Sequence, residues 1–211
     1  MSRGASREAQ AVTLRAAGLL LDYPDAELLA ELPLIAAAVD RLPEPARGQL
    51  LAIVDHLAST PVADLQRDYV DTFDLRRRCC LYLTYYTYGD TRKRGMALLR
   101  FRHAYRASGM ELRDGELPDH LAVVCEYAAT ADLEQGLRLL AEHRAGLELL
   151  HAALDDAHSP YAAVLVALKA VLPPASRREL DRALELARTG PPEEEVGLEP
   201  FGPPEVTGVR R

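Results

Sequence analysis

Tyrosine, cysteine and arginine side chains are concentrated in one stretch, residues 76–95, which reads "RRRCCLYLTYYTYGDTRKRG". Six basic residues and one acid give the stretch a net charge of +5, which leaves −12 on the remainder of a chain whose net charge is −7. Cations neutralise phosphates and aromatic rings stack on bases, so one interpretation is a nucleic-acid-binding or nucleotide-binding segment. Because the acidic remainder would repel nucleic acid, we keep this interpretation as the alternative and expect no nucleic-acid partner.

The residues that could support metal or redox chemistry do not form a complete set. Cys79 and Cys80 are adjacent, and adjacent cysteines bridge only through a strained ring, so we expect two small buried thiols. Glu148 and His151 match one Glu-x-x-His motif, but a di-iron bundle needs two such motifs and two further glutamates. The sequence contains no glycine-rich phosphate loop, nucleophile elbow or HExxH motif. We therefore predict no metal site and no cofactor.

A second polar cluster lies in residues 114–124, "DGELPDHLAVV", which read as a turn followed by a helix start. Pro118 suits the first helical position, and Asp119 would then sit in the first turn, where a carboxylate favours the positive end of the helix dipole. On that interpretation Asp119 is a simple cap. On the other, Glu116, Pro118, Asp119 and His120 form a functional loop at a hinge between two helical halves. The sequence leaves both open.

The elements that would position these residues are helices, because apolar residues recur at helical spacing along almost the whole chain. The longest such stripe runs from Leu133 to Leu154. Prolines and glycines mark the expected helix ends, among them Pro24, Pro43, Pro61, Gly89, Gly109, Pro118, Pro160 and Pro173. Residues 79–88 are ambiguous, because their β-branched and aromatic composition favours a strand while their spacing also fits a helix. We predict an all-α fold, a single bundle of about eight helices.

The chain length and composition suit one domain with a tail. Residues 1–189 form the predicted helical domain, and residues 190–211 are dense in proline, glycine and glutamate. Such a segment buries too little apolar surface to order itself, so we expect a disordered or loosely docked tail whose anchors are Val196, Leu198 and Phe201. We recognise no targeting segment and no apolar run long enough to insert in a membrane. Three cysteines make no disulfide framework, so we expect a cytoplasmic protein.

Two stretches together resemble a known family. Residues 69–95, "YVDTFDLRRRCCLYLTYYTYGDTRKRG", followed by residues 116–129, "ELPDHLAVVCEYAA", closely resemble the nitrate reductase delta subunits, the NarJ assembly chaperones. These belong to the wider TorD-like group of redox-enzyme maturation chaperones, and the resemblance covers residues 10–190. The group's Tyr-x-x-x-Phe pattern falls on Tyr69 and Phe73. Its Glu-Pro-x-Asp-His pattern reads Glu-Leu-Pro-Asp-His here, a displacement of proline that matches the nitrate reductase branch.

The resemblance implies an all-helical, non-catalytic protein. It would bind the N-terminal segment of the nitrate reductase catalytic (alpha) subunit in the cytoplasm. It would hold that apoenzyme open while molybdenum cofactor and an iron–sulfur cluster are inserted, and delay membrane docking until then. Proteins of molybdenum cofactor biosynthesis are further candidate partners.

A client helix in a groove needs large apolar anchors, and tyrosine supplies contact area with few rotors to immobilise. We place the client-binding groove at Tyr69, Phe73, Tyr82, Tyr85 and Tyr86. The open alternative is that two or more of these rings belong only to the core. A basic rim, which would steer an acidic surface or a phosphate-bearing cofactor, consists of Arg76, Arg77, Arg78, Arg92 and Arg94.

Overall fold

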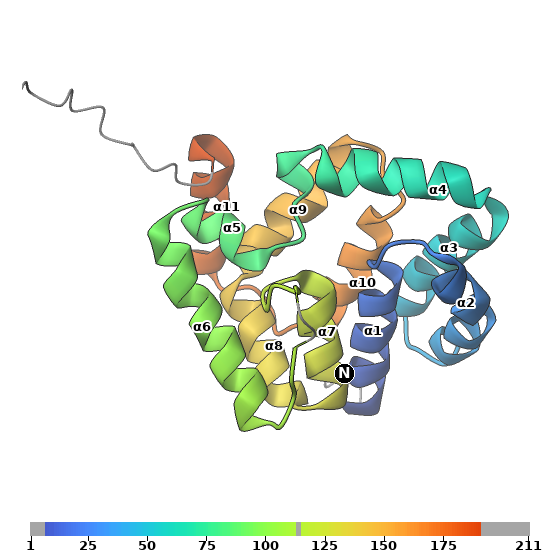
Figure 1. The fold of residues 1–211 in the computed structure, drawn as a ribbon, viewed down its shortest axis with the longest axis horizontal. Coiled ribbons are helices and arrows are strands. Elements are labelled where there is room, and N and C mark those ends of the chain that lie inside the picture. The colour runs from blue at the N-terminus through green and yellow to red at the C-terminus, as the bar shows by residue number, and fades with distance from the viewer. Residues whose placement is uncertain (1–6, 113–114, 191–211) are drawn as a thin grey trace, which may run out of the picture.

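The computed structural model describes residues 7–112 and 115–190, and these residues form an all-α fold, as predicted (Figure 1). Eleven α-helices occur in this part of the chain, against the expected number of about eight. They are α1 (Arg7–Leu20), α2 (Ala26–Val39), α3 (Ala46–Ser59), α4 (Val62–Tyr69), α5 (Leu83–Tyr88), α6 (Arg92–Ala107), α7 (Leu121–Thr130), α8 (Leu133–Glu142), α9 (Arg144–Asp156), α10 (Ala162–Val171) and α11 (Arg177–Thr189). A π-helical turn η1 (Val70–Asp74) and a 3-10 turn η2 (Arg77–Cys79) join α4 to α5.

Helix α7 lies at the centre of the fold, between α1 and α8 (Figure 1). Its side chains are buried along most of its length, Leu121, Val124 and Cys125 completely. Two glycines let its neighbours approach closely. A Cβ on Gly18 of α1 would lie 3.1 Å from the Ala122 carbonyl oxygen, and one on Gly136 of α8 would overlap the Ala128 side chain. The residues that precede α7 are therefore joined to a helix that is packed on both sides.

The extra helices come from breaks that carry no proline or glycine. The stripe from Leu133 to Leu154 is divided into α8 and α9 at His143, whose backbone lies at φ −104° and ψ 17°. Its imidazole Nδ1 lies 2.9 Å from the Leu139 carbonyl oxygen, a contact in which the neutral ring donates. Burial lowers the pKa of His143, consistent with the neutral form. The His143 side chain thus hydrogen-bonds to a backbone carbonyl in the last turn of α8, where the helix ends.

The helices of the described residues run from Arg7 to Thr189, within the predicted domain of residues 1–189. Nearly all of the predicted tail, from residue 191, lies outside the described residues. Among the described helices, none combines the length and the apolar character needed to cross a lipid bilayer.

The close contact between α7 and α8 predicts that Gly136→Ala destabilises the protein. The added methyl group would overlap Ala128 on both its side chain and its backbone, so the free energy of unfolding should fall by about 1–3 kcal/mol in urea titrations. Gly95→Ala in α6 is the matched control, because no atom lies within 4 Å of its added Cβ. That substitution should raise the unfolding free energy by about 0.4–1 kcal/mol. Equal midpoints for both variants would contradict the packing described here.

Candidate functional site

Tyr69 and Phe73 lie in a buried aromatic cluster on the inner side of α4 and η1. Their exposed fractions are 7% and 9%. Their ring centroids are 4.8 Å apart, and Phe73 packs edge-on against Tyr161, the residue that precedes α10, at 4.9 Å. The Tyr69 hydroxyl donates to the Leu21 carbonyl oxygen at 3.0 Å, and burial raises the pKa of this phenol. In this structure the two rings fasten α4 and η1 to the core.

The remaining three tyrosines of the predicted groove divide between the core and the surface. Tyr86 is 3% exposed and donates from its hydroxyl to the carbonyl oxygens of Arg78 and Cys80. Its ring fills the space that a side chain at Gly146 would need, since a Cβ there would lie 2.9 Å from the ring. Tyr82 and Tyr85 are half-buried. The structure thus places Tyr69, Phe73 and Tyr86 in the core and leaves only two of the five rings accessible; their contact with a client stays a prediction.

The arginines expected at a basic rim do not all face solvent. Arg76, Arg77, Arg78 and Arg92 are exposed. Arg78 forms an exposed ion pair with Asp156 at 3.2 Å. The Arg94 side chain is only 17% exposed, because it turns inward beneath the start of α6. Arg94 therefore belongs to an interior cluster rather than to the rim.

That interior cluster is built around the carboxylate of Asp119, which is completely buried. Its Oδ2 atom accepts hydrogen bonds from the Thr84 backbone N–H at 3.0 Å and from the Thr84 hydroxyl at 2.5 Å. A guanidinium nitrogen of Arg94 lies 3.7 Å from the same oxygen, and Arg94 Nε donates to the Thr84 hydroxyl oxygen at 3.1 Å. We call Asp119, Thr84 and Arg94 the carboxylate cluster. It joins α5, α6 and the segment before α7.

Backbone pairing reinforces the carboxylate cluster. Residues 81–83 and 119–121 run antiparallel, with an isolated bridge between Tyr82 and His120. The Leu83 N–H donates to the Asp119 carbonyl at 3.0 Å, and the Leu121 N–H donates to the Leu81 carbonyl at 2.8 Å. This pairing resolves the ambiguity of residues 79–88, because one bridged residue precedes the short helix α5.

The side chains of Tyr82 and His120, which flank this backbone pairing, also contact each other. Their ring centroids are 5.3 Å apart, and the Arg94 guanidinium lies 5.5 Å from the Tyr82 ring centre. Burial lowers the pKa of His120, so its neutral form is favoured. The structure brings Asp119 and His120 together with Tyr82 and Arg94, whereas Glu116 is exposed.

The capping interpretation of Pro118 and Asp119 is wrong. Helix α7 begins at Leu121 with His120 as its N-cap, so Asp119 lies outside the first helical turn. Pro118 is buried before the helix, and its carbonyl oxygen accepts a hydrogen bond from the Tyr105 hydroxyl at 2.6 Å. The carboxylate binds the Thr84 hydroxyl and amide rather than the start of α7. This long-range partner was not predictable from the sequence, because Thr84 lies in a tyrosine-rich stretch and carries no charge.

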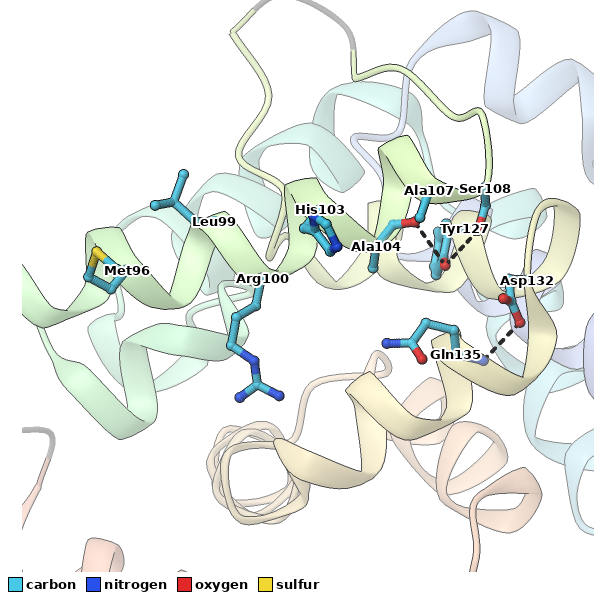
Figure 2. Close-up of a pocket in the computed structure, with 10 residues that line it drawn as sticks. All are labelled: Met96, Leu99, Arg100, His103, Ala104, Ala107, Ser108, Tyr127, Asp132 and Gln135. Carbon is cyan, nitrogen blue, oxygen red and sulfur yellow. Dashed lines mark hydrogen bonds between the residues drawn. The ribbon is translucent and has the colours of Figure 1, made fainter.

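A groove of about 550 Å³ lies between α6 and the adjoining ends of α7 and α8 (Figure 2). Its residues are Met96, Leu99, Arg100, His103, Ala104, Ala107 and Ser108 on the α6 side, and Tyr127, Asp132 and Gln135 opposite. At one end the polar groups bond to the protein itself: the Tyr127 hydroxyl lies 3.1 Å from the Ser108 hydroxyl, and Asp132 caps α8 through the Gln135 N–H. We call this surface the α6–α8 groove.

The other end of the α6–α8 groove is apolar and accessible. Met96 and Leu99 are 69% and 52% exposed, and Figure 2 shows both at the end away from Asp132. Arg100, which pairs with Glu142 at 2.8 Å, and His103 lie beside them. The opposite face of α6 carries Phe101 and Tyr105, which are buried. Helix α6 thus has two apolar faces, and only the face with Phe101 and Tyr105 packs against the core. The sequence predicted one apolar face for this helix and not the second.

No group of three or more histidine, cysteine, aspartate or glutamate side chains in the described residues is arranged to hold a metal ion. The chemistry open to the α6–α8 groove is non-covalent binding of an apolar segment, with cationic donors beside it.

Comparisons with known proteins agree on one family. Residues 39–167 match the family model described as nitrate reductase delta subunit. The chain is 34% identical over 169 residues to the NarJ protein of Bacillus subtilis, a match that covers 80% of this chain and 92% of that protein. It is 33% identical over 146 residues to the nitrate reductase molybdenum cofactor assembly chaperone NarJ of Escherichia coli, covering 68% of this chain and 62% of that one.

Two further relatives bear on length and fold. The chain is 41% identical over 157 residues to the nitrate reductase-like protein NarX of Mycobacterium tuberculosis; the match covers 74% of this chain but spans only 24% of that longer relative. A solved structure described as a redox enzyme maturation protein from Archaeoglobus fulgidus aligns with a TM-score of 0.56 at 22% identity, over 80% of this chain and 94% of that one. At that identity the likeness shows the fold.

The carboxylate cluster predicts that Asp119→Asn lowers the free energy of unfolding by about 1–3 kcal/mol, because a buried acceptor of two hydrogen bonds loses its charge beside Arg94. Asp90→Asn is the matched control. Asp90 also pairs with Arg94, at 3.2 Å, but its side chain is 67% exposed, so its loss should cost less than about 1 kcal/mol. Urea titrations measure both, and an Asp119→Asn variant as stable as Asp90→Asn would show that the cluster does not hold the fold.

Proposed function

Because the chain belongs to the nitrate reductase delta subunit family, we propose that it is a maturation chaperone for respiratory nitrate reductase. The observation that carries the proposal is the match to Bacillus subtilis NarJ along 92% of that protein's length, which leaves little of the relative outside the alignment. The helical fold of the described residues is consistent with it.

In this role the chain binds the apo catalytic subunit through the N-terminal segment of that subunit. It keeps the subunit accessible while molybdenum cofactor and an iron–sulfur cluster are inserted, and then releases it. The role is non-catalytic and cytoplasmic. Its partner is the catalytic subunit, with proteins of molybdenum cofactor biosynthesis as further partners. The nucleic-acid alternative is not favoured, because the named relatives are nitrate reductase proteins and assembly chaperones.

We infer that the client segment binds in the α6–α8 groove as an amphipathic helix. The groove offers what such a helix needs, which is a row of apolar side chains at helical spacing on α6, Met96, Leu99 and Ala107, beside the adjoining ends of α7 and α8. Tyr82 and Tyr85, the accessible members of the predicted set, lie on the segment that leads into α6 and form a second candidate contact. The buried rings at Tyr69, Phe73 and Tyr86 would support the fold rather than meet the client directly.

Binding of a synthetic client peptide tests the proposed site. Titration calorimetry should give a negative heat-capacity change, because apolar surface is buried. Leu99→Glu places a charge on the apolar end of the groove and should weaken binding by about 1–3 kcal/mol. Leu184→Glu on α11, which is 64% exposed, is the matched control and should bind normally. Tyr85→Ala separates the second contact: weakened binding in that variant alone would move the site from the groove to the tyrosine surface.

The maturation role is tested in cells that respire nitrate. A strain lacking this chain should yield nitrate reductase poor in molybdenum, and the intact chain should restore the content. The Leu99→Glu variant should fail to restore it although it accumulates as a folded protein, because Leu99 is exposed and contributes little to the core. Molybdenum content per purified reductase is the measurement. Full content in the strain without the chain would refute the chaperone proposal whatever the peptide titration shows.

A further inference from the structure

The open end of the α6–α8 groove is unusually basic for this protein. Helix α6 reads "RKRGMALLRFRHAYRA" and contains no acid, although the chain carries a net charge of −7. Arg92 and Lys93 precede Met96 by one helical turn, and Arg100 and His103 follow it on the groove side. Residues one turn apart lie on the same helical face. The groove therefore combines exposed Met96 and Leu99 with the cations Arg92 and Lys93 on one side and Arg100, which pairs with Glu142, on the other. Such a surface fits an apolar segment bearing carboxylates.

Such a segment is present in the chain itself. Residues 191–201 read "PPEEEVGLEPF", in which three adjacent glutamates precede Val196, Leu198 and Phe201. These residues lie outside the described part of the chain. The sequence thus matches the groove in both charge and apolar character.

We propose that residues 191–201 bind in the open end of the α6–α8 groove of the same molecule. Val196, Leu198 and Phe201 cover Met96 and Leu99, and the glutamates lie among the cations of α6. The segment acts as an internal ligand, which shields the exposed apolar side chains until a partner with a higher affinity displaces it.

The connection to α11 makes this binding feasible. Helix α11 ends at Thr189, and Gly190 follows with a positive φ of 73°, which redirects the chain. Helices α11 and α5 both pack against α9, and α5 leads into α6; Figure 1 shows α11 on the side of the molecule where α6 begins. Val196 lies six positions after Gly190, and an extended chain over six positions spans about 20 Å.

Tethering also lowers the affinity that such a contact requires. A short linker gives the attached segment an effective concentration in roughly the millimolar range, so a contact with a dissociation constant of about 1 mM would already be substantially occupied. The proposal depends on the charge and apolar character of the groove and not on the identity of the client.

Disulfide trapping in the full-length chain tests the proposal. One variant carries Leu99→Cys with Phe201→Cys, and the control carries Leu184→Cys with Phe201→Cys, both with Cys80→Ser to remove the half-buried native thiol. Leu184 is exposed and is closer to Phe201 along the chain, so tethering alone favours the control pair. We expect the Leu99 pair to form its intramolecular disulfide at least about fivefold faster, because binding raises the local concentration beyond that of a free tether. Added salt should reduce the difference, since the contact is partly electrostatic.

The outcomes separate the possible occupants. Equal rates for the two pairs, or a slower rate for the Leu99 pair, would overturn the proposal. Disulfides between chains that increase with protein concentration would overturn it in favour of a second copy as occupant. A second variant leaves the groove unchanged and replaces Glu193, Glu194 and Glu195 with lysine. In this variant, the rate of disulfide formation in the Leu99 pair should fall towards the rate of the control pair. An unchanged rate would show that the charges do not guide the segment.

Discussion

A buried carboxylate, that of Asp119, holds together the part of the protein that could bind a client. It accepts two hydrogen bonds from Thr84 of α5 and lies beside Arg94 of α6. It therefore joins these two helices to the segment that precedes α7. A buried charge is costly unless it is paired and hydrogen-bonded, which makes this arrangement specific. Since α7 is packed between α1 and α8, the carboxylate connects the beginning of α6 to the core.

Helix α6 is held along one face only. Arg94 attaches the beginning of the helix to Asp119. Further along, the side chains of Phe101 and Tyr105 are buried in the core, and the ring centroids of Tyr105 and Tyr127 are 4.5 Å apart. Its other face, with Met96 and Leu99, forms one side of the α6–α8 groove. A helix anchored in this way presents an apolar surface without needing that surface for its own stability. The same surface can serve a client and an internal segment in turn, so the two proposals describe one site in two states.

Much of the fold was predictable from proline and glycine positions, and the rest was not, for identifiable reasons. Pro61, Gly89 and Pro160 mark helix boundaries that the structure confirms. The break at His143 was missed because a histidine side chain, and not a glycine or proline, ends α8.

The candidate site was less predictable, because burial depends on partners distant in sequence. Tyr69 and Tyr82 look alike in the sequence, yet the first packs against Tyr161 before α10 and is buried, while the second stays half-exposed at the bridge to His120. The turn and helix-start pattern of residues 114–124 predicted a functional loop at Asp119, but the partner Thr84 lies 35 residues away in the sequence. The groove depends on the second apolar face of α6, which carries Met96 and Leu99. This face can be told apart from the core-facing one only when the structure shows that Phe101 and Tyr105 are buried.

The most direct test of the central claim is amide hydrogen exchange of the full chain with and without the client's N-terminal peptide. If the α6–α8 groove is the client site, exchange should slow in α6 and α8, and α4 and η1, which carry the buried aromatic cluster, should be unaffected. Slower exchange confined to α4 and η1, where Tyr69 and Phe73 pack against Tyr161, would contradict the assignment of the groove and indicate that the client binds at the buried rings.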